Sequence, residues 1–253
     1  MPYTEHLILL LASLVANTLS ALAGGGAGLL QLPILLFLGL TFSTALATHK
    51  IASVALGVGA TVRHWREEQL DKSFALFILA CGLPGVVSGA LVILKLDDQI
   101  ATFLLGVLTL GLGIYSAANT TLGQSPMTRN RHLRGYCIGG TVLFAIGILN
   151  GSLTSGTGLF VTIWLVRWFG LEYKTAVAYT LILVGLFWNG FGALTLALQT
   201  PVHWQWLPAL LLGSLLGGYL GAHFSIIKGK RLFQAKCSDM EPSSLLNGVE
   251  VQV

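Results

Sequence analysis

The sequence predicts an all-α integral membrane protein made of two repeats, and three observations support this prediction. Of the 253 residues, 54% are hydrophobic and only 9% are charged, whereas about 25% are charged in an average soluble domain. Several apolar stretches reach the roughly 20 residues that a helix needs to cross a bilayer. Similar motifs, including a glycine-rich interruption, recur in the same order in both halves of the chain.

Five segments have the length and composition of an uninterrupted transmembrane helix, despite a proline early in the last of them. They are residues 43–62, 73–94, 100–118, 175–198 and 206–227.

Two further apolar regions, residues 7–40 and 136–170, are too long for one helix and too short for two full crossings with a turn. A run of glycines interrupts the first, and a run of small polar residues interrupts the second. Two half-helices that meet at an unwound tip fit these lengths, because unwound backbone is tolerated in a bilayer only where protein or a wet cavity surrounds it. We therefore expect each region to dip into the membrane and return.

The two halves of the chain share short motifs at a nearly constant spacing. The sequence TALA at residues 44–47 recurs as TAVA at residues 175–178. The pattern Gly-x-x-x-Gly-Ala at residues 85–90 recurs at residues 217–222, and it is typical of helices whose backbones touch. This order predicts a duplicated unit.

The motifs and the charges together divide the chain into four parts. These are a first transmembrane repeat (1–118), a basic loop (119–135), a second transmembrane repeat (136–233) and a polar tail without predicted structure (234–253). By the positive-inside rule, the basic loops and the C-terminus are cytoplasmic. The second broken region then begins and ends in the cytoplasm and the first begins and ends outside, which predicts inverted repeats.

The two interruptions form the predicted substrate site. Glycine lets backbone N–H groups approach a ligand closely, and hydroxyl and amide side chains add further donors. A half-helix that starts after each tip points its positive end at the same place, which suits an oxyanion. The alternative is that the glycines only permit close helix crossing. The candidate residues are Gly24, Gly25, Gly26, Gly28, Asn150, Ser152, Thr154, Ser155, Gly156 and Thr157.

His49 and Lys50 lie early in an otherwise apolar predicted span. A cation inside the membrane is costly, and it is a functional candidate because it can pair with a bound anion. His49 can gain a proton near neutral pH. The alternative for Lys50 is that its ammonium group reaches out to the lipid headgroups. Asn189 is a polar residue in another span, where it bonds across helices or touches substrate.

Several classes of function find no support in the sequence. The net charge of +4 is spread too thinly for a nucleic-acid surface. The glycine runs lack both the strand context of a dinucleotide fold and the Gly-Lys-Ser/Thr of a P-loop. Cys81, Cys137 and Cys237 are far apart and form no metal or redox motif. We therefore expect no enzymatic activity, no metal and no cofactor.

At these residues the sequence resembles the TauE/SafE family of membrane permeases, often described as sulfite exporters. The resemblance covers about residues 10–230 and rests on three motifs. They are Ala23-Gly24-Gly25-Gly26-Ala27-Gly28 with Pro33, Ala45-x-Ala47-Thr48, and Gly156-Thr157-Gly158. It implies transport of small anions, such as sulfite or organosulfonates, across a plasma membrane.

In one respect the sequence departs from the family pattern. The family usually closes its second half with another hydrophobic helix, whereas here the chain turns polar after Phe233. Residues 100–118 then have no counterpart, and a second copy of the chain would supply the missing surface in a homo-oligomer.

We therefore predict a secondary transporter in the lipid bilayer that carries a small anionic substrate. The alternatives are a non-transporting membrane subunit or assembly factor, and a channel.

Overall fold

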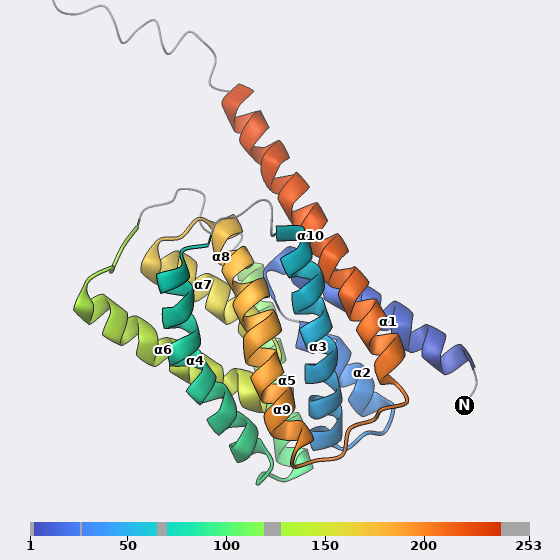
Figure 1. The fold of residues 1–253 in the computed structure, drawn as a ribbon. Coiled ribbons are helices and arrows are strands. Elements are labelled where there is room, and N and C mark those ends of the chain that lie inside the picture. The colour runs from blue at the N-terminus through green and yellow to red at the C-terminus, as the bar shows by residue number, and fades with distance from the viewer. Residues whose placement is uncertain (1–2, 26, 65–69, 119–127, 239–253) are drawn as a thin grey trace, which may run out of the picture.

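The computed structural model describes residues 3–25, 27–64, 70–118 and 128–238, and of residues 3, 113, 115–118 and 228–238 it describes the backbone alone. The described part of the chain folds into helices and contains no strand (Figure 1). In chain order the elements are α1 (Tyr3–Ala23), η1 (Ala27–Leu29), α2 (Gln31–Phe37), α3 (Phe42–His64), α4 (Lys72–Ile93), α5 (Asp98–Ala118), α6 (Leu133–Ser152), α7 (Thr157–Phe169), α8 (Tyr173–Tyr179), the π-helical η2 (Thr180–Trp188), α9 (Asn189–Ala197) and α10 (Leu207–Ser238).

Six of the described helical stretches are long and apolar enough to cross a membrane: Thr4–Ala23, Phe42–His64, Lys72–Ile93, Leu133–Ser152, Tyr173–Ala197 and Leu207–Ile227. Four of them confirm predicted spans. The predicted span 100–118 is helical as α5, of which Asp98–Leu112 is a shorter apolar stretch. The backbone of α10 continues to Ser238, beyond the predicted start of the polar tail.

The broken regions differ from the expected pairs of half-helices. In each region the first helix, α1 or α6, has the length of a full span, and only the second is short. The predicted interruption at Asn150 begins later, because α6 stays helical through Ser152. The Ser152 hydroxyl donates to the Ile148 carbonyl at 2.8 Å, which accommodates a polar side chain within the helix.

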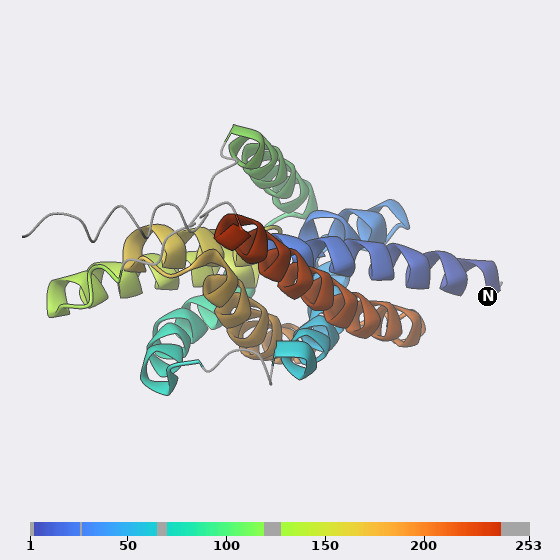
Figure 2. The ribbon, with the colours of Figure 1, turned by 90° about the horizontal axis from the view of Figure 1, so that it is seen from above.

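The helices α1 and α6 run in opposite directions. In Figure 1, α1 rises from the N-terminus at the lower right and α6 descends from the upper left, so both end near the centre of the molecule. Seen from above in Figure 2, they extend to opposite sides. The short helices α2 and α7 lead back towards the ends from which α1 and α6 came.

Glycines allow the closest helix contacts. A Cβ added to Gly217 would lie 2.7 Å from the Leu14 carbonyl oxygen, so α10 packs directly on α1. On the other side, a Cβ on Gly89 would overlap the Ile148 carbonyl, so α4 packs on α6 in the same way. The predicted role of the two Gly-x-x-x-Gly-Ala patterns in close packing is therefore confirmed.

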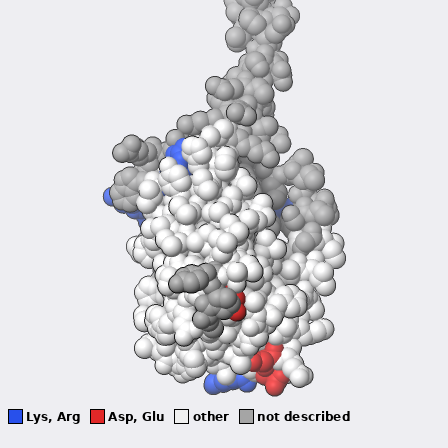
Figure 3. All heavy atoms as spheres, turned by 90° about the vertical axis from the view of Figure 1, so that its right-hand side faces the viewer, with Lys and Arg blue, Asp and Glu red and all other residues white. Residues whose placement is uncertain are grey.

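The outer surface suits contact with lipid. Figure 3 shows a face with a wide, almost uncharged area above a lower edge where both acidic and basic side chains gather. The helix α5 lies apart at one side of the bundle (Figure 2). It buries Ala101 and Leu105 and exposes Phe103 and Leu110, each at 70%. In a membrane protein, such exposed apolar side chains face hydrocarbon rather than water.

Candidate functional site

The two helix interruptions touch at the centre of the molecule. Gly24 and Gly25 follow α1 with φ of +80° and +112°, and Gly156 precedes α7 with φ of +67°. A Cβ on Gly25 would lie 2.7 Å from the Cα of Gly158, and a Cβ on Gly158 would lie 2.9 Å from the Cα of Gly25. A side chain at Gly25 or Gly158 would push the two tips apart. The positive φ of Gly24, Gly25 and Gly156 favours glycine independently of this contact.

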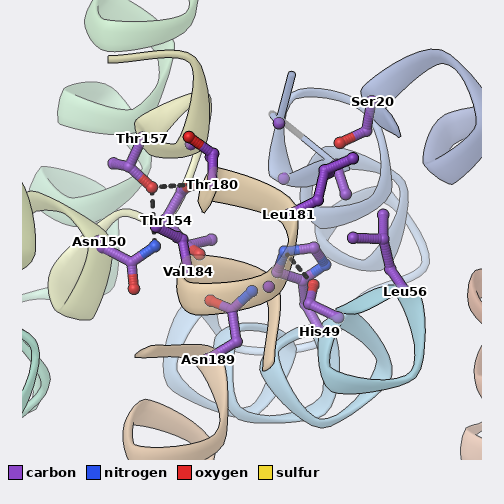
Figure 4. A pocket seen from close by; sticks show the side chains of 16 residues that line it. Ser20, His49, Leu56, Asn150, Thr154, Thr157, Thr180, Leu181, Val184 and Asn189 are labelled. Carbon is purple, nitrogen blue, oxygen red and sulfur yellow. Dashed lines mark hydrogen bonds between the residues drawn. The ribbon is translucent and has the colours of Figure 1, made fainter. Parts of the chain in front are cut away.

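A small cavity lies beside this contact (Figure 4). It measures about 30 Å³, whereas one water needs at least about 10–15 Å³. It therefore has room for about two waters and must widen to admit a larger anion. Its described lining consists of Ser20, Gly25, Ala27, Gly28, His49, Ser53, Leu56, Asn150, Thr154, Thr157, Gly158, Thr180, Leu181, Val184, Gly185 and Asn189.

The structure brings six of the predicted site residues to this lining. They are Gly25, Gly28, His49, Asn150, Thr154 and Thr157. Gly26 lies outside the described residues.

The other predicted residues stand around the cavity. The Gly24 carbonyl accepts a hydrogen bond from Thr162 Oγ1 at 2.8 Å. Ser152 bonds back to its own helix, and Ser155 Oγ lies 3.0 Å from Thr109 Oγ1 of α5. A Cβ on Gly156 would overlap the Leu112 side chain. These residues support the tips and do not face the cavity.

Lys50 is fully buried directly behind the cavity wall. Its ammonium group donates to Asn150 Oδ1 at 2.9 Å, Asn189 Oδ1 at 3.2 Å and Thr154 Oγ1 at 3.3 Å. All three acceptors line the cavity. The alternative that Lys50 reaches the headgroups is wrong, because neutral oxygens from α6, the loop after it and α9 hold the side chain inside.

The charge of Lys50 is hydrogen-bonded but not neutralised. Within the described part of the chain, its partners are all uncharged, and no cavity-lining residue carries a carboxylate. A buried cation without a counterion is unfavourable, and an anion in the cavity would offset it.

The ammonium group also orients the two amides. An ammonium only donates, so Asn150 and Asn189 must both turn their oxygens towards it. The Asn150 nitrogen then donates to Thr157 Oγ1 at 2.8 Å. The Asn189 nitrogen has no acceptor among the described residues, and Figure 4 shows it on the side of His49.

A second unused donor comes from α1. Ser20 is 5% exposed, and its hydroxyl has no hydrogen-bond partner among the described residues. In Figure 4 its oxygen points towards the centre of the cavity. Buried hydroxyls are normally paired, so this one is available to a ligand.

The segments after the breaks complete the wall. The helix α7 begins at Thr157, and Gly158 in its first turn lines the cavity with an N–H that has no partner inside the helix. Opposite it, the π-helical η2 contributes Thr180 and Val184. Such π segments occur often at functional sites.

The sequence reasoning missed Ser20, Ser53 and Thr180. The repeat contained a signal for Thr180, since it occupies in the second half the position that His49 occupies in the first. Ser20 and Ser53 resemble the other hydroxyl residues of apolar helices, and no sequence signal distinguishes them.

Among the described residues, no three His, Cys, Asp or Glu side chains come together in a group that could hold a metal ion. The cavity instead presents hydroxyl, amide and backbone N–H donors.

Comparison with known proteins agrees with this membrane architecture. The family described as "Sulfite exporter TauE/SafE" matches residues 9–236. A probable membrane transporter protein of Haemophilus influenzae is 28% identical over 90% of this chain and 88% of its own length. The probable membrane transporter protein YfcA of Escherichia coli K12 is 26% identical over 90% and 83%, respectively. YdhB of Bacillus subtilis, another probable membrane transporter protein, is 26% identical over 88% and 91%.

No solved structure matches the chain. The family match covers nearly the whole membrane portion, including both helix breaks and the cavity between them. The chain is thus a multi-pass membrane transporter that belongs to the sulfite exporter TauE/SafE family.

Proposed function

We propose that this transporter binds a small oxyanion, such as sulfite or an organosulfonate, in the cavity between the two helix breaks. The observation that carries this proposal is the buried Lys50, whose charge lies behind the cavity wall without a counterion among the described residues. The free donors of Ser20 and Asn189 and the first turn of α7 give the anion hydrogen bonds. The family description as sulfite exporters supports the same substrate class.

The proposal includes a mechanism of alternating access by inverted repeats. It is supported by the opposite directions of α1 and α6 and by the backbone contact between Gly25 and Gly158. If one half rocks against the other about this contact, the cavity opens first to one side and then to the other. Such a movement would also widen a cavity that now has room for about two waters.

The membrane and the orientation are part of the same proposal. We place the protein in the plasma membrane, with the end of α3 at Arg63 and the start of α6 at Arg134 on the cytoplasmic side. In Figure 1, α3 ends and α4 begins at the upper end of the bundle.

Uptake of radiolabelled sulfite and methanesulfonate into proteoliposomes tests the function. We expect saturable uptake of each anion, and each anion should inhibit the uptake of the other. A labelled organic cation of similar size should not be taken up. A protein that inserts into the liposomes, unfolds cooperatively and moves neither anion would contradict transport and favour a membrane subunit without transport activity.

A further inference from the structure

The ring of His49 lies in the cavity wall between two neutral partners. Its Nδ1 is 2.9 Å from Gln31 Oε1, and its Nε2 is 3.1 Å from Ser53 Oγ. His49 is 1% exposed and Ser53 is 2% exposed, and both line the cavity. The ring is labelled in Figure 4, where it stands between α3 and the centre of the cavity.

The hydrogen bonds of Gln31, on the side away from His49, decide which ring nitrogen of His49 carries the hydrogen. Ser13 Oγ donates to the Leu210 carbonyl at 2.9 Å, so it accepts from Gln31 Nε2 at 3.0 Å. Gln31 therefore turns its oxygen towards His49, and only a hydrogen on Nδ1 completes that contact. In the neutral ring, Nε2 is then an acceptor, and the Ser53 hydroxyl donates to it.

Protonation of Nε2 reverses the direction of this last hydrogen bond. The new N–H donates to Ser53 Oγ. The Ser53 hydroxyl keeps its hydrogen but no longer donates it to His49. Because Ser53 lines the cavity, that hydrogen can turn inward, where the oxygen of an anion accepts it. One proton on His49 thus creates one additional donor for the ligand.

Lys50 makes this protonation depend on the anion. Lys50 directly follows His49 on α3. If both side chains are positively charged, they repel each other strongly, because the site is buried. Gln31 of α2, Asn189 of α9 and Ser214 of α10 face the region with neutral groups. An anion in the cavity offers the charge compensation that a second cation requires.

The other charged or titratable side chains on the elements packed against α3 lie away from the cavity lining. In the described part of these elements they are Glu5 and His6 at the start of α1, Asp98 of α5 beside the Phe42 N–H, and Tyr219 and His223 of α10, the latter bonded to Arg63 in the last turn of α3.

We propose that His49 is a proton-binding site coupled to the anion site through Ser53, so that the transporter binds one proton together with each anion. This inference rests on the proposed function, since it concerns the same cavity. It adds the proton as a second substrate and assigns its binding atom, Nε2 of His49.

Calorimetry of the purified protein with methanesulfonate tests the coupling. A sulfonate stays ionised between about pH 5 and pH 8, the range in which histidine titrates, so any pH dependence comes from the protein. Titrations in buffers of different ionisation enthalpy count the protons taken up. In the wild type we expect the uptake of about one proton per sulfonate bound. The affinity for sulfonate should fall by up to about tenfold for each unit by which the pH rises.

Variants of the two residues locate the coupling. His49→Gln keeps an amide for hydrogen bonding but cannot titrate, so proton uptake should disappear. Ser53→Ala should weaken the pH dependence, and Ser53→Thr should restore it because it retains a hydroxyl. Ser88→Ala is the matched control, since Ser88 is on α4 and, among the described residues, its hydroxyl bonds to the Pro84 carbonyl of its own helix alone.

The outcomes separate the two proposals. Sulfonate binding without proton uptake in the wild type, or equal uptake in His49→Gln, overturns the coupling and leaves the anion site in place. A wild-type protein that unfolds cooperatively but binds no sulfonate at any pH overturns the proposed function as well.

Discussion

At the scale of single residues, Lys50 shows how the surroundings of a charge decide its role. The side chain is long enough to reach a membrane interface from many positions. Here it turns inward, because three oxygens from distant parts of the chain accept its hydrogen bonds. Gly192 makes this possible, since a Cβ at that position would lie 2.9 Å from Lys50 Cδ and 3.2 Å from its Nζ.

The first prediction concerns the charge itself. Lys50→Met removes the cation while it keeps much of the volume, and we expect sulfonate affinity to fall by about 10- to 100-fold, the size of a Coulomb interaction with one charge several ångströms away in a partly screened site. Lys50→Arg retains the charge and should lose less. Binding is measured by calorimetry in detergent. Equal, small losses in both variants would mean that the anion does not sense this charge.

The second prediction uses a matched pair of glycines on α9. Gly192→Ala should displace the ammonium group from its three acceptors and weaken sulfonate binding. Gly190→Ala should have no such effect, because no heavy atom lies within 4 Å of the added Cβ. Both variants receive the same change in helix propensity, so the comparison isolates the contact with Lys50. If both bind sulfonate like the wild type, the position of Lys50 does not matter for binding.

At the scale of helices, backbone contact between pairs of helices dominates the packing. The helix α10 approaches α1 through Gly217, and α4 approaches α6 through Gly89. Such small-residue contacts stabilise helix pairs in lipid, where apolar burial from water adds little. The two pairs hold α1 and α6, the first helices of the broken regions, while the tips meet at the centre.

The third prediction tests one of these contacts. Gly89→Ala places a methyl group against the Ile148 carbonyl, and overpacking of this kind costs about 1–3 kcal/mol. We expect a lower midpoint of thermal unfolding in detergent. Gly106→Ala on α5 is the control, since its added Cβ meets nothing within 4 Å. An unchanged midpoint for Gly89→Ala would show that α4 and α6 do not touch so closely.

At the scale of the whole molecule, the question is which end of the bundle faces the cytoplasm. The fourth prediction assigns the loop before α6 to the cytoplasm and the start of α1 to the outside. Single cysteines at Thr4, Gln199 and His132, which are all exposed, report this after the native cysteines are replaced. A membrane-impermeant maleimide should label the first two from outside and His132 only after the membrane is opened. Labelling of Gln199 but not Thr4 would place the two ends on opposite sides and contradict the inverted arrangement.

The sequence by itself determined the class of the protein, its family resemblance and the positions of most helices. Hydropathy is a local property, so spans such as Phe42–His64 and Leu207–Ile227 follow from it. Glycine runs are local as well, and the helix does end at Ala23 before Gly24 and Gly25.

Only the tertiary structure decided which of these residues meet. Lys50 and Asn150 are 100 positions apart in sequence, yet they share a hydrogen bond. Ser20 lines the cavity because α1 ends there. The sequence around Ser20 gives no sign of this position. A buried polar residue acquires its role from partners that other helices bring to it, and the packing of those helices is a property of the whole fold.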